Sequence, residues 1–113
     1  MKKSDAKREL ISQEISNELK SLLKSNLKKI ILYGSYAYGT PDDDSDIDIL
    51  ALVDIEEDQF ANYNNRISEI ATTICIKHEI LPSIILENSK KFEKYLEVVP
   101  FYQNVLKGIT LYG

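Results

Sequence analysis

The apolar residues of this chain recur with two different periods, and each period predicts a different element. Residues 4–26 carry apolar side chains close to every 3.6 positions, which predicts an amphipathic helix. Residues 30–33 form a short apolar run ended by Gly34, as expected of a buried strand. Residues 46–53 begin with alternating Asp and Ile and become continuously apolar, which predicts a second strand.

The second half of the chain repeats this change of period. Asp54, with Glu57 three residues later, is a candidate cap for a helix whose apolar face includes Ile67 and Ile74. Residues 79–87 predict a third strand, and Pro82 places it at a sheet edge because proline cannot donate to a ladder. Short helices are expected near residues 89–96 and 100–107. The predicted order is α-β-β-α-β-α, an α/β (α+β) fold with helices on a small mixed sheet.

Length and composition fit one domain spanning residues 1–113. The chain is 43% hydrophobic and 28% charged, which is typical of a globular protein. That length leaves no room for a separate substrate-binding domain. No apolar run approaches the roughly 20 residues that cross a bilayer, and the basic N-terminus has no apolar segment after it. We therefore expect a cytoplasmic protein without a membrane segment.

Cysteine, histidine and charge narrow the classes of function. Cys75 and His78 are single residues of their kinds, so this chain alone builds neither a disulfide framework nor a Cys/His zinc site. The net charge of −4 disfavours nonspecific nucleic-acid binding, and we expect no direct contact with nucleic acid. Residues 42–58 hold nine of the 18 acidic residues and no Lys or Arg. A hard-cation site made of carboxylates remains open.

Two aspartates at the start of the second strand suggest such a site. Side chains at i and i+2 of a strand lie on one face, about 6.6 Å apart, so Asp46 and Asp48 project together. Two carboxylates repel each other unless a cation lies between them, and Mg²⁺ would fit that role. The alternative is a solvent-facing strand whose polar positions are Asp, although Asp is disfavoured in strands.

Gly34 and Ser35 follow the first strand directly. Glycine allows a tight turn and a close approach of another backbone, and a helical turn opened by Ser35 would offer free N–H groups to an anion. A lone Gly-Ser pair is more often a plain turn. Combined with Asp46 and Asp48, it could hold a triphosphate whose oxygens are bridged by the metal ions.

This pattern, Gly34-Ser35, ten residues, then Asp46-x-Asp48, resembles the signature of the polymerase-beta-like nucleotidyltransferase superfamily. The short length and the neighbouring residues are similar to its minimal nucleotidyltransferase branch. The resemblance is strongest over residues 28–54. It implies a three-carboxylate site with two Mg²⁺ ions that transfers AMP from ATP to a hydroxyl. It also implies a HEPN-domain partner in a hetero-oligomer, a toxin that the transferase silences as antitoxin by adenylylating a tyrosine.

The resemblance assigns roles residue by residue. Gly34, Ser35 and Ser45 would bind the nucleotide, and Asp46 and Asp48 would be the first two metal ligands and catalytic carboxylates. The third carboxylate is expected on the third strand; we assign it to Glu79, at the start of that strand, with Glu87 at its far end as the second candidate. Tyr38 departs from the family pattern, which often has Arg there.

Two alternatives stay open. One is a degenerate transferase that neutralises a HEPN partner by binding alone, which the Glu in third position and Tyr38 favour. The other is a transferase acting on a small-molecule hydroxyl, although enzymes of that kind usually carry a further domain for the acceptor.

Overall fold

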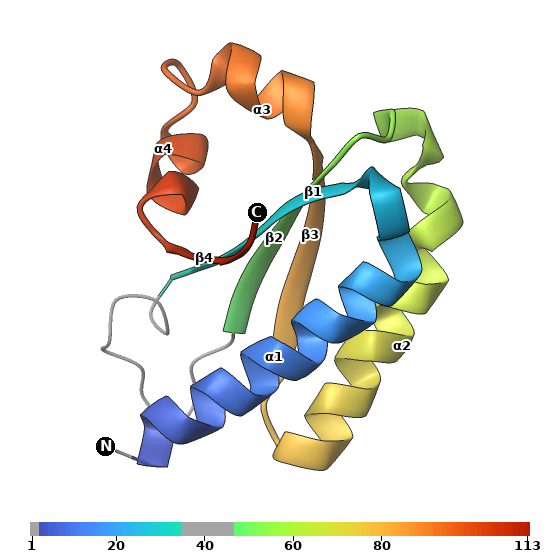
Figure 1. Cartoon of the computed structure of the whole chain (residues 1–113), viewed down its shortest axis with the longest axis vertical. Coiled ribbons are helices and arrows are strands. Elements are labelled where there is room, and N and C mark those ends of the chain that lie inside the picture. The colour runs from blue at the N-terminus through green and yellow to red at the C-terminus, as the bar shows by residue number, and fades with distance from the viewer. Residues whose placement is uncertain (1–2, 35–46) are drawn as a thin grey trace.

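The computed structural model describes residues 3–34 and 47–113. Its elements lie around one sheet (Figure 1). Two short 3-10 turns, Lys24–Asn26 and Glu57–Gln59, precede β1 and α2. In chain order the helices and strands are α1 (Lys3–Leu23), β1 (Leu27–Tyr33), β2 (Ile47–Val53), α2 (Ala61–His78), β3 (Pro82–Asn88), α3 (Ser89–Tyr95), α4 (Pro100–Leu106) and β4 (Ile109–Tyr112).

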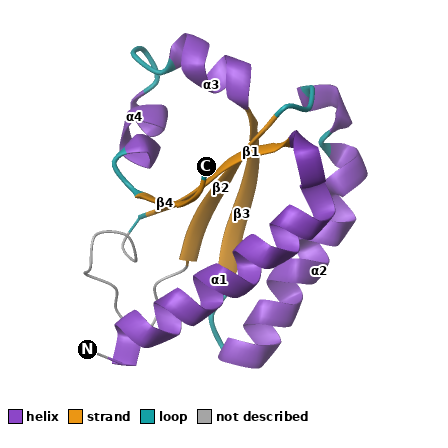
Figure 2. Cartoon of the chain, in the orientation of Figure 1, coloured by secondary structure: helices purple, strands orange, loops and turns teal. Residues whose placement is uncertain are grey.

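The four strands form a mixed sheet in the order β3-β2-β1-β4 (Figure 2). β1 is antiparallel to both β2 and β4. β2 and β3 are parallel, and α2 makes the crossover between them, as a parallel pair requires. The described strands at the two edges are therefore β3 and β4.

Helices α1 and α2 pack side by side on one face of the sheet (Figure 1). They contribute Ile11, Ile15 and Ile74 to a core that also holds Ile49 and Val53 of β2. Each of these side chains is at most 2% exposed, so this face is closed to solvent. Burial of so many branched residues is the main stabilising term of this half of the fold.

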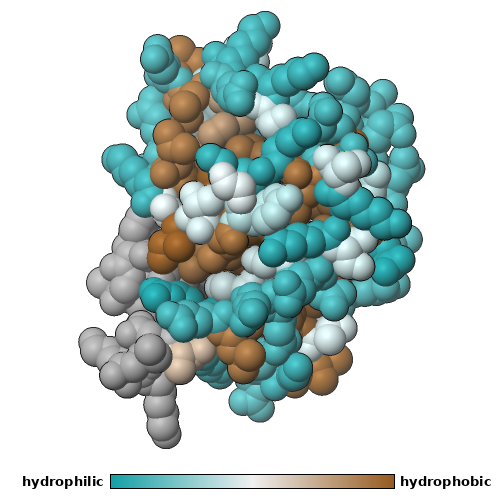
Figure 3. Space-filling model, in the orientation of Figure 1, coloured by the Kyte–Doolittle hydropathy of each residue, from teal (hydrophilic) through white to brown (hydrophobic). Residues whose placement is uncertain are grey.

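Helices α3 and α4 lie on the opposite face and are only seven residues each. Their core is smaller and consists of Ile31, Leu50, Leu52, Phe92, Tyr102 and Val105. Figure 3 shows hydrophobic residues gathered at the surface over these two helices, where Val98, Phe101 and Leu106 are 71%, 40% and 50% exposed. This face is therefore less completely covered than the other one.

The structure confirms most of the predicted elements. The long first helix, the first two strands and the two short helices near residues 89–96 and 100–107 are all present. Pro82 is the first residue of an edge strand, as its missing N–H demands.

Two features differ from the sequence-based expectation. Helix α2 begins at Ala61, after a 3-10 turn, so Asp54 is not its cap; the Asp54 N–H instead donates to the Asn26 carbonyl at 2.7 Å. The C-terminal residues form β4 on the free side of β1, whereas the expected order ended in a helix. Four residues with no clear alternation are too short a segment to stand out as a strand.

Within the described part of the chain, no helix has the length and hydropathy to cross a membrane.

Candidate active site

Asp48 is the described residue around which the candidate site is built. It lies on β2, paired with Tyr33 of β1 on one side and with Ser83 of β3 on the other. Its neighbours Ile47 and Ile49 belong to the α1/α2 core, so alternation points Asp48 to the α3/α4 face. Leu50 and Leu52, on the same face as Asp48, are buried in the α3/α4 core, whereas Asp48 is only half-buried. Among the residues that the structure describes, the Asp48 carboxylate therefore lies beyond the part of this face that α3 and α4 bury.

Gly34 packs directly against the Asp48 carboxylate. It has a φ of +77°, a backbone conformation that favours glycine. A Cβ built on Gly34 would overlap Asp48 Oδ2 and lie 3.3 Å from Asp48 Cγ. The glycine that ends β1 thus lets the chain turn directly against the carboxylate, and any other residue would push it aside. The two halves of the sequence motif meet in space through this contact.

Tyr33 forms one side wall of the site. Burial, and then the negative charge of Asp48, raise the pKa of Tyr33 to about 12. Its ring packs edge-on against Phe101 of α4, with ring centroids 5.6 Å apart. The Tyr33 hydroxyl therefore stays protonated at neutral pH and can donate a hydrogen bond beside Asp48.

Three of the predicted site residues, Ser35, Ser45 and Asp46, lie outside the described residues. Their roles remain predictions that rest on the sequence motif. The described part of the motif is Gly34 at one end and Asp48 at the other.

Glu87, the second candidate for the third carboxylate, does not lie near Asp48, so the strand pairing contradicts that assignment. It pairs with Leu52, four residues beyond Ser83, which is about 13 Å further along the strand. Tyr102 donates its hydroxyl to Glu87 Oε2 at 2.9 Å, and the Asn88 N–H donates to Oε1 at 3.1 Å. Burial and this hydrogen bond raise the pKa of Tyr102. Glu87 thus ties β3 to α4 and stabilises the fold.

Glu79 is not on the third strand, which corrects its predicted placement there. It is the C-cap of α2, with φ +59°, and its N–H donates to the Cys75 carbonyl at 2.8 Å. β3 begins three residues later, at Pro82. The sequence alternation near His78 suggested a strand because a left-handed cap is not visible in a hydropathy pattern. Glu79 is exposed, and its role as third carboxylate stays a prediction.

The donor chemistry fits a magnesium site at Asp48 in part. A carboxylate oxygen is a ligand that Mg²⁺ prefers, and Gly34 places no side chain of its own against the Asp48 oxygens. Among residues 3–34 and 47–113, no three His, Cys, Asp or Glu side chains are grouped so as to hold a metal ion. Tyr33 and Ser83 are not among the site residues that the sequence predicts. Only strand register places them beside Asp48, and the motif spacing carries no such signal.

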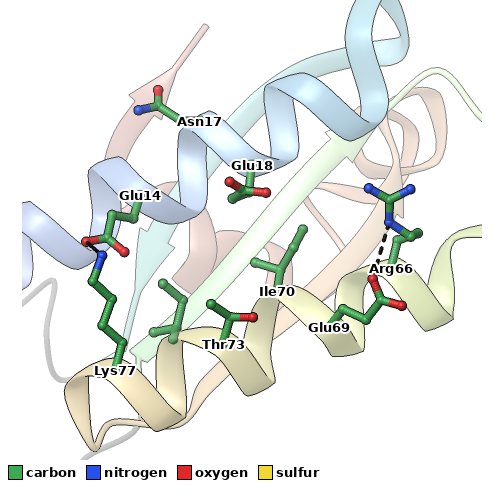
Figure 4. A pocket seen from close by; sticks show the side chains of 9 residues that line it. Glu14, Asn17, Glu18, Arg66, Glu69, Ile70, Thr73 and Lys77 are labelled. Carbon is green, nitrogen blue, oxygen red and sulfur yellow. Dashed lines mark hydrogen bonds and ion pairs between the residues drawn. The ribbon is translucent and has the colours of Figure 1, made fainter.

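A separate cavity of about 460 Å³ lies between α1 and α2 (Figure 4). Lys77 donates to Glu14 Oε1 at 3.2 Å, and His78 Nε2 lies 3.2 Å from the same oxygen. Burial disfavours the Glu14 carboxylate, but the hydrogen bonds and charges of Lys77 and His78 outweigh it and lower the pKa of Glu14. This cavity opens on the α1/α2 face and does not contain Asp48.

Two archaeal proteins are similar to this chain in sequence over most of their length. The chain is 36% identical over 101 residues to "Putative protein adenylyltransferase MJ0604" of Methanocaldococcus jannaschii, covering 88% of this chain and 93% of the relative. It is 33% identical over 92 residues to "Putative protein adenylyltransferase MJ0141" of the same organism, covering 81% and 91%.

Two solved structures share the fold. A crystal structure of a toxin–antitoxin with AMP-PNP superposes with a TM-score of 0.58 at 22% identity, covering 90% of this chain and 73% of that one. A mutant of the toxin–antitoxin MntA-HpeT gives a TM-score of 0.56 at 20% identity, with the same coverage.

The family model described as a nucleotidyltransferase domain matches residues 12–109, which include all of β1 to α4. This agrees with the mixed sheet, with the Gly34–Asp48 contact and with the resemblance to minimal nucleotidyltransferases. The chain belongs to the nucleotidyltransferase domain family and is a nucleotidyltransferase.

Proposed function

We propose that this nucleotidyltransferase transfers AMP from ATP to a hydroxyl of a partner protein, and that it acts as an antitoxin by modifying a tyrosine of a HEPN-domain toxin. The observation that carries the proposal is the packing of Gly34 against the Asp48 carboxylate. It supports a site in which the glycine turn and the aspartate strand act together on one ligand.

The chemistry requires positioning and charge neutralisation and little covalent work by the protein. The acceptor oxygen would bond to the α-phosphorus of ATP as the bond to the pyrophosphate leaving group breaks, and the acceptor proton would pass to a carboxylate of the site, for which Glu79 is the candidate, or to water. Asp46 and Asp48 would hold Mg²⁺, with two ions expected and Glu79 as a further carboxylate at the same end of the sheet. When bound, the metal would neutralise the phosphate charge and lower the pKa of the acceptor hydroxyl.

The remaining site residues would hold and orient ATP. Backbone N–H groups at the turn after Gly34, together with the hydroxyls of Ser35 and Ser45, would bind the outer phosphates. The protonated hydroxyl of Tyr33 would donate to a phosphate oxygen or to a metal-bound water beside Asp48. The sequence shows no motif that selects the base, so adenine is supported by the relatives' names.

A protein is the acceptor class that the relatives favour. The two archaeal relatives carry the words protein adenylyltransferase in their names, and both solved neighbours are toxin–antitoxin structures. We also propose that residues 1–113 form a single domain. In this proposal the partner protein itself supplies the surface through which the acceptor hydroxyl is recognised.

The test is an incubation of the chain with ATP, Mg²⁺ and its candidate HEPN partner, followed by the intact mass of both proteins. We expect the partner to gain the mass of one or more AMP units, and peptide mapping to place them on tyrosine. The Asp48→Asn variant should give no gain. A stable complex of unchanged mass would instead support a second candidate, a module that neutralises its partner by binding alone. The absence of a carboxylate on β3 beside Asp48 favours that candidate.

A further inference from the structure

A groove of about 380 Å³ lies between helix α1 and the edge strand β4 (Figure 1). Two of its lining residues, Leu32 and Leu111, belong to the α1/α2 core, so the groove is on the opposite face of the sheet from Asp48. Its α1 wall runs from Arg8 to Lys20, which is about 18 Å along the helix axis. A groove of this length matches about five residues of extended chain.

Two serine hydroxyls in this groove are buried without a hydrogen-bond partner. Ser12 and Ser16 line the groove and are each 5% exposed. Neither Oγ atom has a hydrogen-bond partner within the described chain. A buried hydroxyl that is left unpaired destabilises a fold, and alanine favours a helix interior more than serine does. The two serines therefore weaken the free protein, which indicates a ligand that pairs with them.

Strand β4 borders the same groove and has a free edge. It pairs with β1 on one side, and no described strand pairs with its other side. Proline and charged residues commonly protect edge strands from further pairing. The edge strand β3 begins with Pro82, whereas Ile109–Tyr112 includes neither proline nor a charge. Because Ile109 and Tyr112 are each 38% exposed, only the shortness of β4 limits its pairing with a further strand.

The spacing of the hydroxyls fits an extended peptide. Residues four apart in a helix are about 6 Å apart along its axis, and alternate side chains of a strand are about 6.6 Å apart. A strand added beside β4 would therefore direct two alternate side chains at Ser12 and Ser16. Those side chains pair with the serines if they carry hydroxyl or amide groups. Among the charged lining residues, Arg8 and Lys20 outnumber Glu9, which favours a peptide with acidic residues.

We propose that this groove binds an extended segment of a partner protein, which adds a strand to the free edge of β4 and places Ser, Thr or Asn side chains against Ser12 and Ser16. A second copy of this chain lacks that chemistry. Antiparallel pairing of two β4 strands would turn Ile109 and Leu111 of the copy toward the groove and leave both hydroxyls unpaired. Because the groove is on the opposite face from Asp48, this inference goes beyond the proposed function and does not depend on AMP transfer.

The test is an NMR titration of the ¹⁵N-labelled chain with the acetylated and amidated peptide EVTVTVE, in which two threonines alternate. We expect amide shifts and slower hydrogen exchange in Ile109–Tyr112, and shifts at Ser12 and Ser16. The peptide EVAVAVE should bind at least about tenfold more weakly, because it lacks the paired hydroxyls. The Ser12→Ala/Ser16→Ala variant should bind both peptides equally. No shift in β4, or equal affinity of wild type for the two peptides, would overturn the inference.

Thermal unfolding without peptide separates a ligand site from a structural role for the serines. Ser12→Ala and Ser16→Ala each remove an unpaired hydroxyl and favour the helix, so each should raise the Tm by a few degrees. Gln13→Ala, at an exposed position of the same helix, is the control and should change the Tm less. If neither serine variant gains Tm, the hydroxyls are already satisfied in the free protein and the inference is overturned.

Discussion

The α1/α2 face of the sheet supplies most of the buried core, whereas the α3/α4 face carries the candidate active site. The α1/α2 face is closed by two long helices, and its core includes fifteen buried residues of the described chain, among them the fully buried Ile47 and Ile49 of β2. Of the described residues, six form the core of the α3/α4 face under two seven-residue helices, and Asp48 towards the end of this face is half-buried. Both faces are built from the same strand, because residues alternate along β2.

This difference shows how a small domain accommodates a charged site. A carboxylate is costly in a closed core, and the half-buried Asp48 lies beyond the buried Leu50 and Leu52 on its face. The closed face supplies the stability that holds its strand in place. Changes on the α3/α4 side should therefore affect transfer more than stability, and changes on the α1/α2 side should do the reverse.

The largest expected effect is on transfer. Asp48→Asn keeps the shape of the side chain but removes the charge that binds the metal, and it should lower the rate of AMP transfer by about 10³-fold. Glu87→Gln, the matched change on the same face, should leave the rate within about twofold because the Glu87 carboxylate is bonded to Tyr102 and to the Asn88 N–H, about 13 Å along the strand from Ser83. Label transfer from α-labelled ATP measures both. Equal losses of transfer rate in the two variants would contradict a catalytic role for Asp48 and a structural role for Glu87.

A pair of neighbouring core residues compares the two faces directly. Ile49 and Leu50 are both fully buried but project to opposite faces of β2. Ile49→Ala should cost about 3 kcal/mol of unfolding free energy, since the closed α1/α2 core relaxes little around a cavity. Leu50→Ala should cost less stability and more transfer rate, because Leu50 lies on the same face as Asp48. Urea unfolding and the transfer assay together decide this, and the reverse ranking would contradict it.

Gly34 links the fold to the site. Gly34→Ala must relieve both the positive φ and the overlap with Asp48 Oδ2, and it should cost about 2 kcal/mol of stability and most nucleotide binding. Gly113 has a φ of +88°, and a Cβ there would overlap the Lys28 carbonyl. Gly113→Ala is the control, and it should reduce stability with nucleotide affinity unchanged. Calorimetric titration with ATP and Mg²⁺ separates the two variants; tight ATP binding by Gly34→Ala would show that this contact is dispensable.

Glu79 has a left-handed backbone conformation, which glycine adopts with less strain than glutamate does. Glu79→Gly should therefore raise the unfolding free energy by about 1 kcal/mol. If Glu79 supplies the third carboxylate, the same variant loses transfer rate. Glu79→Asn, uncharged and tolerant of this conformation, should lose transfer rate to the same extent. Full activity in both variants would remove Glu79 from the site.

The smallest expected effect concerns pH on the α1/α2 side. The pKa of Glu14 is lower in the folded protein than its ordinary 4.5, because the hydrogen bonds and charges of Lys77 and His78 outweigh burial, so the Glu14 carboxylate and its ion pair with Lys77 stabilise the fold above that pH. This contribution, about 0.5 kcal/mol, is lost as the pH falls below 4.5 through the folded pKa. Glu14→Gln should lack this part of the acid dependence, whereas its AMP transfer should match wild type. Unfolding measured between pH 3 and pH 7 tests it, and an unchanged acid profile would refute it.

Much of the architecture follows from local sequence signals. The period of α1, the apolar runs of β1 and β2, and Pro82 at an edge position are properties of neighbouring residues, so they can be recognised without tertiary information. The Gly34-Ser35 and Asp46-x-Asp48 spacing was equally visible, because a strand–turn–strand motif is contiguous in the chain.

Other features depend on contacts between distant segments. β4 exists because the free edge of β1 accepts it, and its four residues show no strand pattern of their own. Glu79 was expected on a strand, but the left-handed cap of α2 displaces it. The place of Ser83 beside Asp48 follows from the register between β2 and β3, which are separated in sequence by a whole helix. Because the crossover helix α2 separates β2 from β3 in the chain, motif spacing alone does not predict which residue stands next to Asp48.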